Sequence, residues 1–279
     1  MKGYEEGLIR FGEDGKSNSS GEGFLVLDTL FKSTPFGEIP WNLEGTKVLV
    51  TLPEKAKFIK IEASKGIKNT FFETVECKLH EDGSIDCFLE KNSAGQGAIY
   101  DKNILMNLTY EERKKVFENE MTINLPNSML INYKAVNLEN NEPLVEKIEY
   151  KYLNYAAKTD DLLIFDLSAT GLALGTSFIS DKRTYPVKFP YNNLVTQKVI
   201  IDIPEGYKIK EMPANLSLKS SIGMFTAKVY TVGNKIEIVK NYLRDRSFFE
   251  AKEYKDLKNF YDSMVNFNKG KIILQKLNN

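Results

Sequence analysis

Cysteine and histidine, side chains that often serve as nucleophiles, bases and metal ligands, are concentrated in one short stretch of this sequence. The chain of 279 residues has two cysteines, Cys77 and Cys87, and one histidine, His80. Residues an odd number of positions apart in a strand point to opposite faces, so Cys77 and His80 do not form a nucleophile–base pair. The three residues also fall short of the four ligands of a structural zinc site. We therefore expect no metal site here and no cofactor.

The two cysteines suit a cross-strand pair. If residues 81–83 form a three-residue hairpin loop with Gly83 in the left-handed bulge position, Cys77 lies opposite Cys87. Alternation makes this a non-hydrogen-bonded position, where a structural disulfide fits. A two-residue turn would instead set Cys77 opposite Phe88 and break this pairing. For an intracellular chain, the alternative to a disulfide is two free buried thiols. An oxidised pair would indicate export.

Two residues near the N-terminus are further candidates for a site. Asp28 follows an apolar run, where its simplest role is to end a strand and hydrogen-bond the turn at Thr29. Trp41, the sole tryptophan, is either an exposed platform for binding or part of a packed junction, and packing is favoured. The scattered acids identify no glycosidase pair, because such a pair needs a defined separation.

The elements that would position these residues are mainly strands. Alternating or β-branched runs separated by Pro, Gly and Asn predict them. The expected strands are residues 47–52, 57–63, 70–79, 84–90, 128–138, 143–155, 162–167, 185–189, 195–203, 206–211, 224–232, 235–242 and 272–274. Residues 128–155 form a long hairpin, and Gly233-Asn234 predicts a tight one.

Two helices interrupt the strands. Thr109 and Glu112 have the spacing of a capping box, which predicts a helix over about 109–119. Apolar residues at helical spacing predict an amphipathic helix over about 251–267. The expected fold is therefore mainly β, an antiparallel β-sandwich with two α-helices.

Composition narrows the possible functions. Hydrophobic residues make up 42% and charged residues 27%, as in a folded globular protein. Basic and acidic residues balance at 38 each, so no net field attracts nucleic acid or anionic lipid. No run approaches the ~20 apolar residues of a membrane-spanning helix. We expect no nucleic-acid partner and no membrane span.

An ordered series of short motifs extends over most of the chain. It resembles the C-terminal part of bacterial transglutaminase-like proteins of the cell envelope. The motifs are Leu27-Asp-Thr, Pro35-Phe-Gly-Glu-Ile-Pro40, the Asp82-Gly83 hairpin, a Gly95-Gln-Gly97 strand, Arg183-Thr-Tyr-Pro-Val187, Ile203-Pro-Glu-Gly-Tyr207, Glu211-Met-Pro213, the Tyr254 helix and Ile272-Ile-Leu274. In that family a papain-like core is followed by a β-rich domain of unassigned function.

The resemblance implies a role for Asp28. The family's core uses Cys, His and Asp in that chain order, and Asp28 falls where the acid would lie. Residues 1–27 contain neither Cys nor His, so nucleophile and base are absent from this stretch. Asp28 is then a relic of a triad, and we expect this chain not to be an enzyme.

The resemblance also implies an organisation. Residues 1–45 correspond to the tail of the core and a linker, and residues 46–279 to a β-sandwich region that divides near residue 183. The preferred function is a non-catalytic accessory or interaction module whose partner is the missing core or another envelope protein. The alternatives are the truncated tail of a Cys-His-Asp protease or transglutaminase, and a carbohydrate-binding or glycan-active β-sandwich. A periplasmic, cell-surface or secreted location is expected, although residues 1–7 lack the apolar core of a signal peptide.

Overall fold

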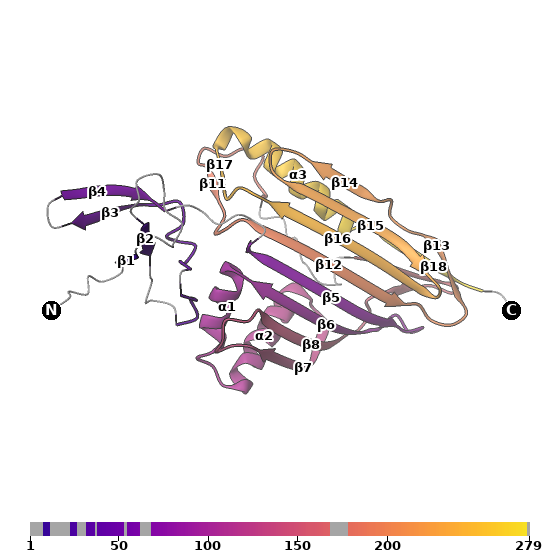
Figure 1. Ribbon diagram of the computed structural model, residues 1–279. Helices are drawn as coiled ribbons and strands as arrows, with labels where there is room; N and C mark the ends of the chain where they lie inside the picture. Colours follow the sequence, from indigo (N-terminus) through magenta and orange to yellow (C-terminus); the bar gives the residue numbers. More distant parts are fainter. Residues whose placement is uncertain are drawn as a thin grey trace.

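The computed structural model of the chain describes residues 8–11, 23–26, 32–36, 38–52, 55–61, 68–167 and 178–277. Strand is the dominant element, at 46% against 19% helix, which confirms the mainly β fold class. An eight-stranded sheet is the largest feature (Figure 1). Its strands, in spatial order, are β14 (Leu216–Lys219), β15 (Met224–Val232), β16 (Lys235–Arg244), β12 (Asn193–Asp202), β5 (Thr70–Leu79), β6 (Ile85–Ala94), β8 (Leu144–Tyr152) and β7 (Ser128–Val136).

The centre of this sheet joins distant parts of the sequence. Strands β5 and β12 pair in parallel, whereas the other pairs of the sheet are antiparallel. The predicted hairpins are present as β7–β8 and β15–β16. Strands from both sides of residue 183 therefore share one continuous ladder.

Smaller sheets complete the strand inventory of the described residues. A four-stranded sheet has the order β13-β18-β10-β9, and three further sheets are strand pairs. These strands are β13 (Tyr207–Glu211), β18 (Lys271–Lys276), β10 (Leu162–Asp166), β9 (Ala157–Lys158), β11 (Val187–Lys188) with β17 (Phe248–Phe249), β3 (Lys47–Leu52) with β4 (Lys55–Lys60), and β1 (Leu8–Phe11) with β2 (Gly23–Val26).

Both predicted helices are present. Helix α2 (Tyr110–Asn124) begins at the capping box of Thr109 and Glu112 and continues beyond the predicted end. Helix α3 (Tyr254–Asn268) follows a 3₁₀ turn, η2 (Ala251–Glu253). No described helix is long and apolar enough to cross a membrane.

A third helix, α1 (Gln96–Leu105), replaces the strand expected at Gly95–Gly97, and that expectation was wrong. Gly95 has φ 72°, a conformation that ends strand β6 and that side chains with a Cβ rarely adopt. The amide of Gln96 then donates to the Asn69 side chain at 2.9 Å, which satisfies a free N–H of the first helical turn. A residue far away in the sequence thus starts this helix.

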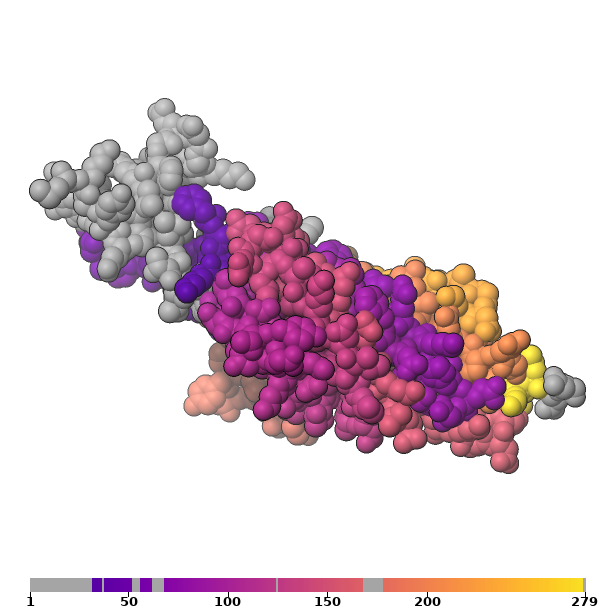
Figure 2. Space-filling model, turned by 90° about the horizontal axis from the view of Figure 1, so that it is seen from below, coloured from indigo at the N-terminus to yellow at the C-terminus, as the bar shows by residue number. Residues whose placement is uncertain are grey.

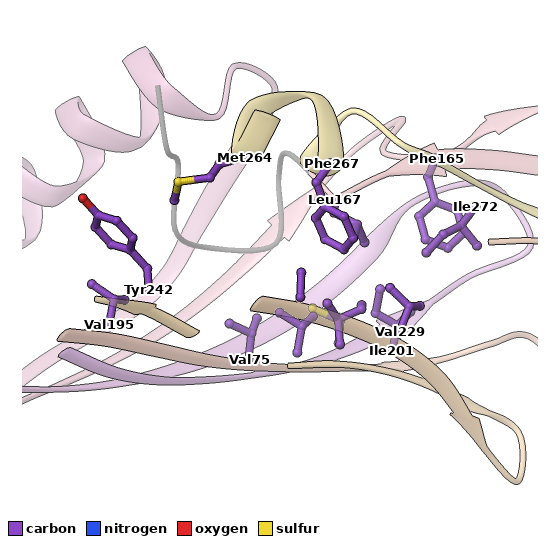
Figure 3. Close-up of a cluster of buried hydrophobic side chains, with 14 of the residues drawn as sticks. Val75, Phe165, Leu167, Val195, Ile201, Val229, Tyr242, Met264, Phe267 and Ile272 are labelled. Carbon is purple, nitrogen blue, oxygen red and sulfur yellow. The ribbon is translucent and has the colours of Figure 1, made fainter. Parts of the chain in front are cut away.

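The hydrophobic core lies between the large sheet and the elements that cover one of its faces. Figure 3 shows side chains of α3 and of the four-stranded sheet facing those of the large sheet. Met264, Phe267, Phe165 and Ile272 lie on one side, and Val75, Val195, Ile201 and Val229 on the other. We call this covered face of the large sheet the inner face. Burying it supplies the main driving force for the fold.

Candidate functional site: a buried polar row on the inner sheet face

Five polar side chains cross the middle of the apolar inner face in a single line. Direct register partners on adjacent strands place them in the order Lys240, Gln197, Glu73, Lys91, Glu146. The neighbouring registers on either side are mostly apolar, for example Ile238–Val199–Val75 and Tyr242–Val195–Phe71. We call these five residues the polar row. Charged groups in such surroundings need partners, because water does not solvate them.

One end of the polar row is a partly buried ion-pair cluster. Lys91 Nζ lies 2.9 Å from Glu146 Oε2 and 3.6 Å from Asp101 Oδ2 of α1. The Tyr133 hydroxyl donates to the other oxygen of Glu146 at 2.8 Å. Glu146 therefore holds both a lysine and a tyrosine, and three strands and a helix meet at this cluster.

The cluster shifts the pKa of Lys91 and of Asp101, each for a clear physical reason. Burial alone would lower the pKa of Lys91, but the charges of Glu146, Asp101 and Glu73 outweigh it and the pKa is raised. Burial raises the pKa of Asp101, and the Lys91 charge only partly opposes this. Asp101 keeps 32% of its side chain exposed, so it is the acid of the cluster that contacts solvent.

The other end of the polar row contains an amide and an amine. Gln197 Nε2 donates to Glu73 Oε2 at 2.7 Å. Lys240 is 1% exposed, and within the described part of the chain its Nζ has no hydrogen-bond partner. Burial lowers the pKa of Lys240 to about 8, against the opposing charge of Glu73. Lys240 is thus a buried amine that gives up its proton unusually easily.

An aromatic and arginine cluster next to the polar row holds α3 on the sheet. Arg244 Nη1 donates to the hydroxyls of Tyr242 and Tyr261, which are 2.6 Å apart. The Arg244 guanidinium also stacks on Phe189, 3.8 Å from the ring centroid. These contacts fix the position of the helix, and we assign them a structural role.

The residues singled out by the sequence lie elsewhere. Cys77 and Cys87 are directly opposite each other and form a disulfide with a Cα–Cα distance of 4.2 Å. The register is the predicted one, with Gly83 at φ 85°. His80, on the same hairpin, pairs with Asp86 at 2.7 Å. In the described residues no three His, Cys, Asp or Glu side chains are grouped to hold a metal ion.

Of the two candidates near the N-terminus, Trp41 is among the described residues. Asp28 lies outside the described residues. Trp41 is half-buried in a turn over residues 41–45. Gln96 Nε2 donates to the Ile39 carbonyl at 2.6 Å and to Glu44 at 3.3 Å. The segment that carries Trp41 is therefore anchored on α1.

Sequence comparison gives one family match. Residues 169–274 match DUF3858, described as a domain of unknown function with a solved structure. The matched range includes β12, β16 and α3, and hence Gln197, Lys240 and Arg244. No curated protein matches the chain.

Comparison with solved structures finds a crystal structure from Parabacteroides distasonis described as a "putative protease". It has 21% sequence identity and a TM-score of 0.37 over 42% of this chain. The match covers 24% of that chain.

The polar row was not predicted from the sequence. Its signal was present, because Glu73 and Lys91 fall at positions of their strands that share a face with Val75 and Leu89. An ionisable residue at an inward position is informative, since such residues are rarely buried without partners. The identity of those partners, however, depended on which strands become neighbours.

Proposed function

We propose that this chain is a non-catalytic, β-rich accessory module that packs beside a transglutaminase-like core in a longer polypeptide of the cell envelope. The observation that carries the proposal is the anchored segment at residues 33–44. Besides the Gln96 contacts, Ser33 Oγ donates to the Ile99 carbonyl at 2.6 Å. A segment held at both ends on α1 transmits the position of the preceding domain to the sheet.

Exposed apolar side chains at the same end of the molecule support a packed neighbour. Leu49 and Phe58 are direct cross-strand partners on β3 and β4 and are 51% and 71% exposed. Phe36 is 71% exposed as well. Figure 2 shows indigo parts of the chain at one end of the molecule, beside the magenta surface of the following elements. Large apolar groups gathered at one end are typical of a contact surface.

The cysteine chemistry supports a non-catalytic role and an oxidising location. A thiolate is the nucleophile of the related cores, and here both sulfurs are tied in the Cys77–Cys87 disulfide. The histidine is paired with Asp86 and not with a thiol. Disulfides persist mainly outside the cytoplasm, which favours the envelope location.

The size of the native protein tests the proposed organisation. Immunoblotting of the source cells with an antibody against residues 178–277 should detect a polypeptide clearly longer than 279 residues. A native protein of the size of this chain would refute the module in its proposed form. Release of ammonia from glutamine peptides by this chain alone would refute the non-catalytic role.

A pair of substitutions tests the contact surface in the longer polypeptide. Leu49→Asp with Phe58→Asp should separate the unfolding of the module from that of the preceding domain and speed proteolysis between them. Val232→Asp is the matched control, because Val232 is 50% exposed at the distant β15–β16 turn. If the pair behaves like the control, this surface does not contact the preceding domain.

A further inference from the structure

The lysine end of the polar row brings together three groups that can react with one another. Lys240 lies directly opposite Gln197, and Gln197 lies directly opposite Glu73. The three side chains are on the inner face, with exposures of 1%, 0% and 9%. Directly opposite residues have Cβ atoms only ~4.5–5.5 Å apart, so rotation about the side-chain bonds of Lys240 moves its amine past the Gln197 amide.

The Lys240 amine (Nζ) and the Gln197 amide oxygen (Oε1) both lack hydrogen-bond partners among the described residues. An isolated ammonium in apolar surroundings is unfavourable, so burial increases the neutral fraction of the Lys240 amine, and a neutral lysine amine is a nucleophile. The low pKa of Lys240, about 8 as a result of burial, agrees with this.

Glu73 is in position to carry the proton. It accepts a hydrogen bond from Gln197 Nε2 at 2.7 Å, and its charge acts on Lys240. A carboxylate that is hydrogen-bonded to the leaving nitrogen, and near enough for its charge to act on the attacking amine, relays a proton from the amine to the leaving group.

We propose that Lys240 and Gln197 become joined by an intramolecular amide bond, with Glu73 as the proton carrier. Lys240 Nζ attacks the side-chain carbonyl carbon of Gln197, and a new C–N bond forms. The bond from that carbon to Nε2 breaks, and Nε2 leaves as ammonia with the proton that Nζ loses. One amide replaces another, so the reaction needs no oxidant, reductant or further reactant.

The product would be a covalent link between β12 and β16 at the centre of the large sheet. The apolar registers on either side, Tyr242–Val195 and Ile238–Val199, keep water away from it and so protect the new bond from hydrolysis. This link does not depend on the proposed accessory role, because it concerns only the sheet itself.

Mass spectrometry of the folded, purified chain tests the link. After reduction of the disulfide, the intact mass should be lower than that of the sequence by one ammonia, about 17 Da, as amide exchange requires. Trypsin does not cut at an acylated lysine, so the digest should contain residues 189–198 linked to residues 236–244. An unmodified mass, or free peptides ending at Lys198 and Lys240, would refute the proposal.

Variants locate the chemistry. Lys240→Arg and Glu73→Gln should each have the full mass of their sequence, with circular dichroism to show that they are folded. Gln197→Glu should lose water, about 18 Da, instead of ammonia, because a carboxyl group then reacts.

Lys198→Arg is the matched control and should stay linked, since Lys198 pairs with Glu237, away from the inner face. A loss of ammonia that persists in Lys240→Arg would assign the link elsewhere and refute the proposal. If a variant fails to fold, the wild-type digest alone decides.

Discussion

Lys91 on β6 and Glu146 on β8 face each other directly across the inner sheet surface, with Nζ 2.9 Å from Oε2. The Glu146 side chain is only 8% exposed, and the pair is enclosed by Tyr133 and Asp101. A buried pair of this kind is costly to break but not necessarily stabilising as a whole, because both charges have lost their hydration.

Breaking this pair from one side should therefore destabilise the chain strongly. We expect Glu146→Leu to lower the free energy of unfolding by about 3 kcal/mol, the lower end of the range for a buried pair, because Lys91 keeps 25% of its side chain exposed and Tyr133 loses its acceptor. The double variant Lys91→Met/Glu146→Leu should recover most of that loss. Urea denaturation followed by circular dichroism measures both. A double variant as unstable as the single one would contradict this account.

The Cys77–Cys87 link closes a short hairpin, so its contribution to stability should be moderate. We expect Cys77→Ala/Cys87→Ala to lower the free energy of unfolding by about 2–3 kcal/mol, because the unfolded chain gains conformational freedom. The oxidation state itself is checked by alkylation and intact mass on protein from an oxidising export route and from the cytoplasm. Two alkylated thiols in both preparations of the folded protein would show that Cys77 and Cys87 do not form a disulfide.

Gly95 and Gly206 offer a matched pair of backbone substitutions. Both have positive φ, 72° and 78°, so alanine should cost about 1–2 kcal/mol at each position through backbone strain. At Gly95 a Cβ would also overlap the Asn69 side chain and the Lys68 carbonyl, whereas at Gly206 it meets open space. We expect Gly95→Ala to cost roughly 1–3 kcal/mol more than Gly206→Ala, the range for overpacking. Equal midpoints in urea would show that α1 does not depend on this close approach.

When Lys240 cannot be linked, the stability of the folded chain should depend on pH in a specific way. In Gln197→Met no amide can form, and Lys240 should titrate at about 8 in the folded state against an ordinary value of 10.5. The unfolded state then binds more protons between these pH values, so stability should rise from pH 8 to pH 10.5. The full rise is about 3 kcal/mol at ~1.4 kcal/mol per pH unit.

The control for this titration is Gln197→Met/Lys240→Met, which should lack that rise. The wild-type chain, linked through Lys240, should follow the control. Urea denaturation at several pH values gives the three curves. If Gln197→Met and the double variant respond identically to pH, Lys240 does not titrate in this window.

Features of the fold that depend on neighbours in the sequence were predictable. The box of Thr109 and Glu112 predicted the start of α2, because both partners lie within one helical turn. The position of Gly83 predicted the register that sets Cys77 opposite Cys87. In each case the residues that interact are a few positions apart, so their spacing in the sequence is enough to suggest the local structure.

The sequence alone thus indicated a mainly β chain and two of its helices, and it offered the register with Cys77 opposite Cys87 as one of two alternatives. Only the tertiary structure decided that β5 and β12 are parallel neighbours, that Asn69 starts α1, and that Lys240, Gln197 and Glu73 share one line. Alternation tells which face of a strand a side chain occupies, but not which strand lies beside it. Because strand order in a sheet is set by long-range packing, the polar row became visible only when the sheet was assembled.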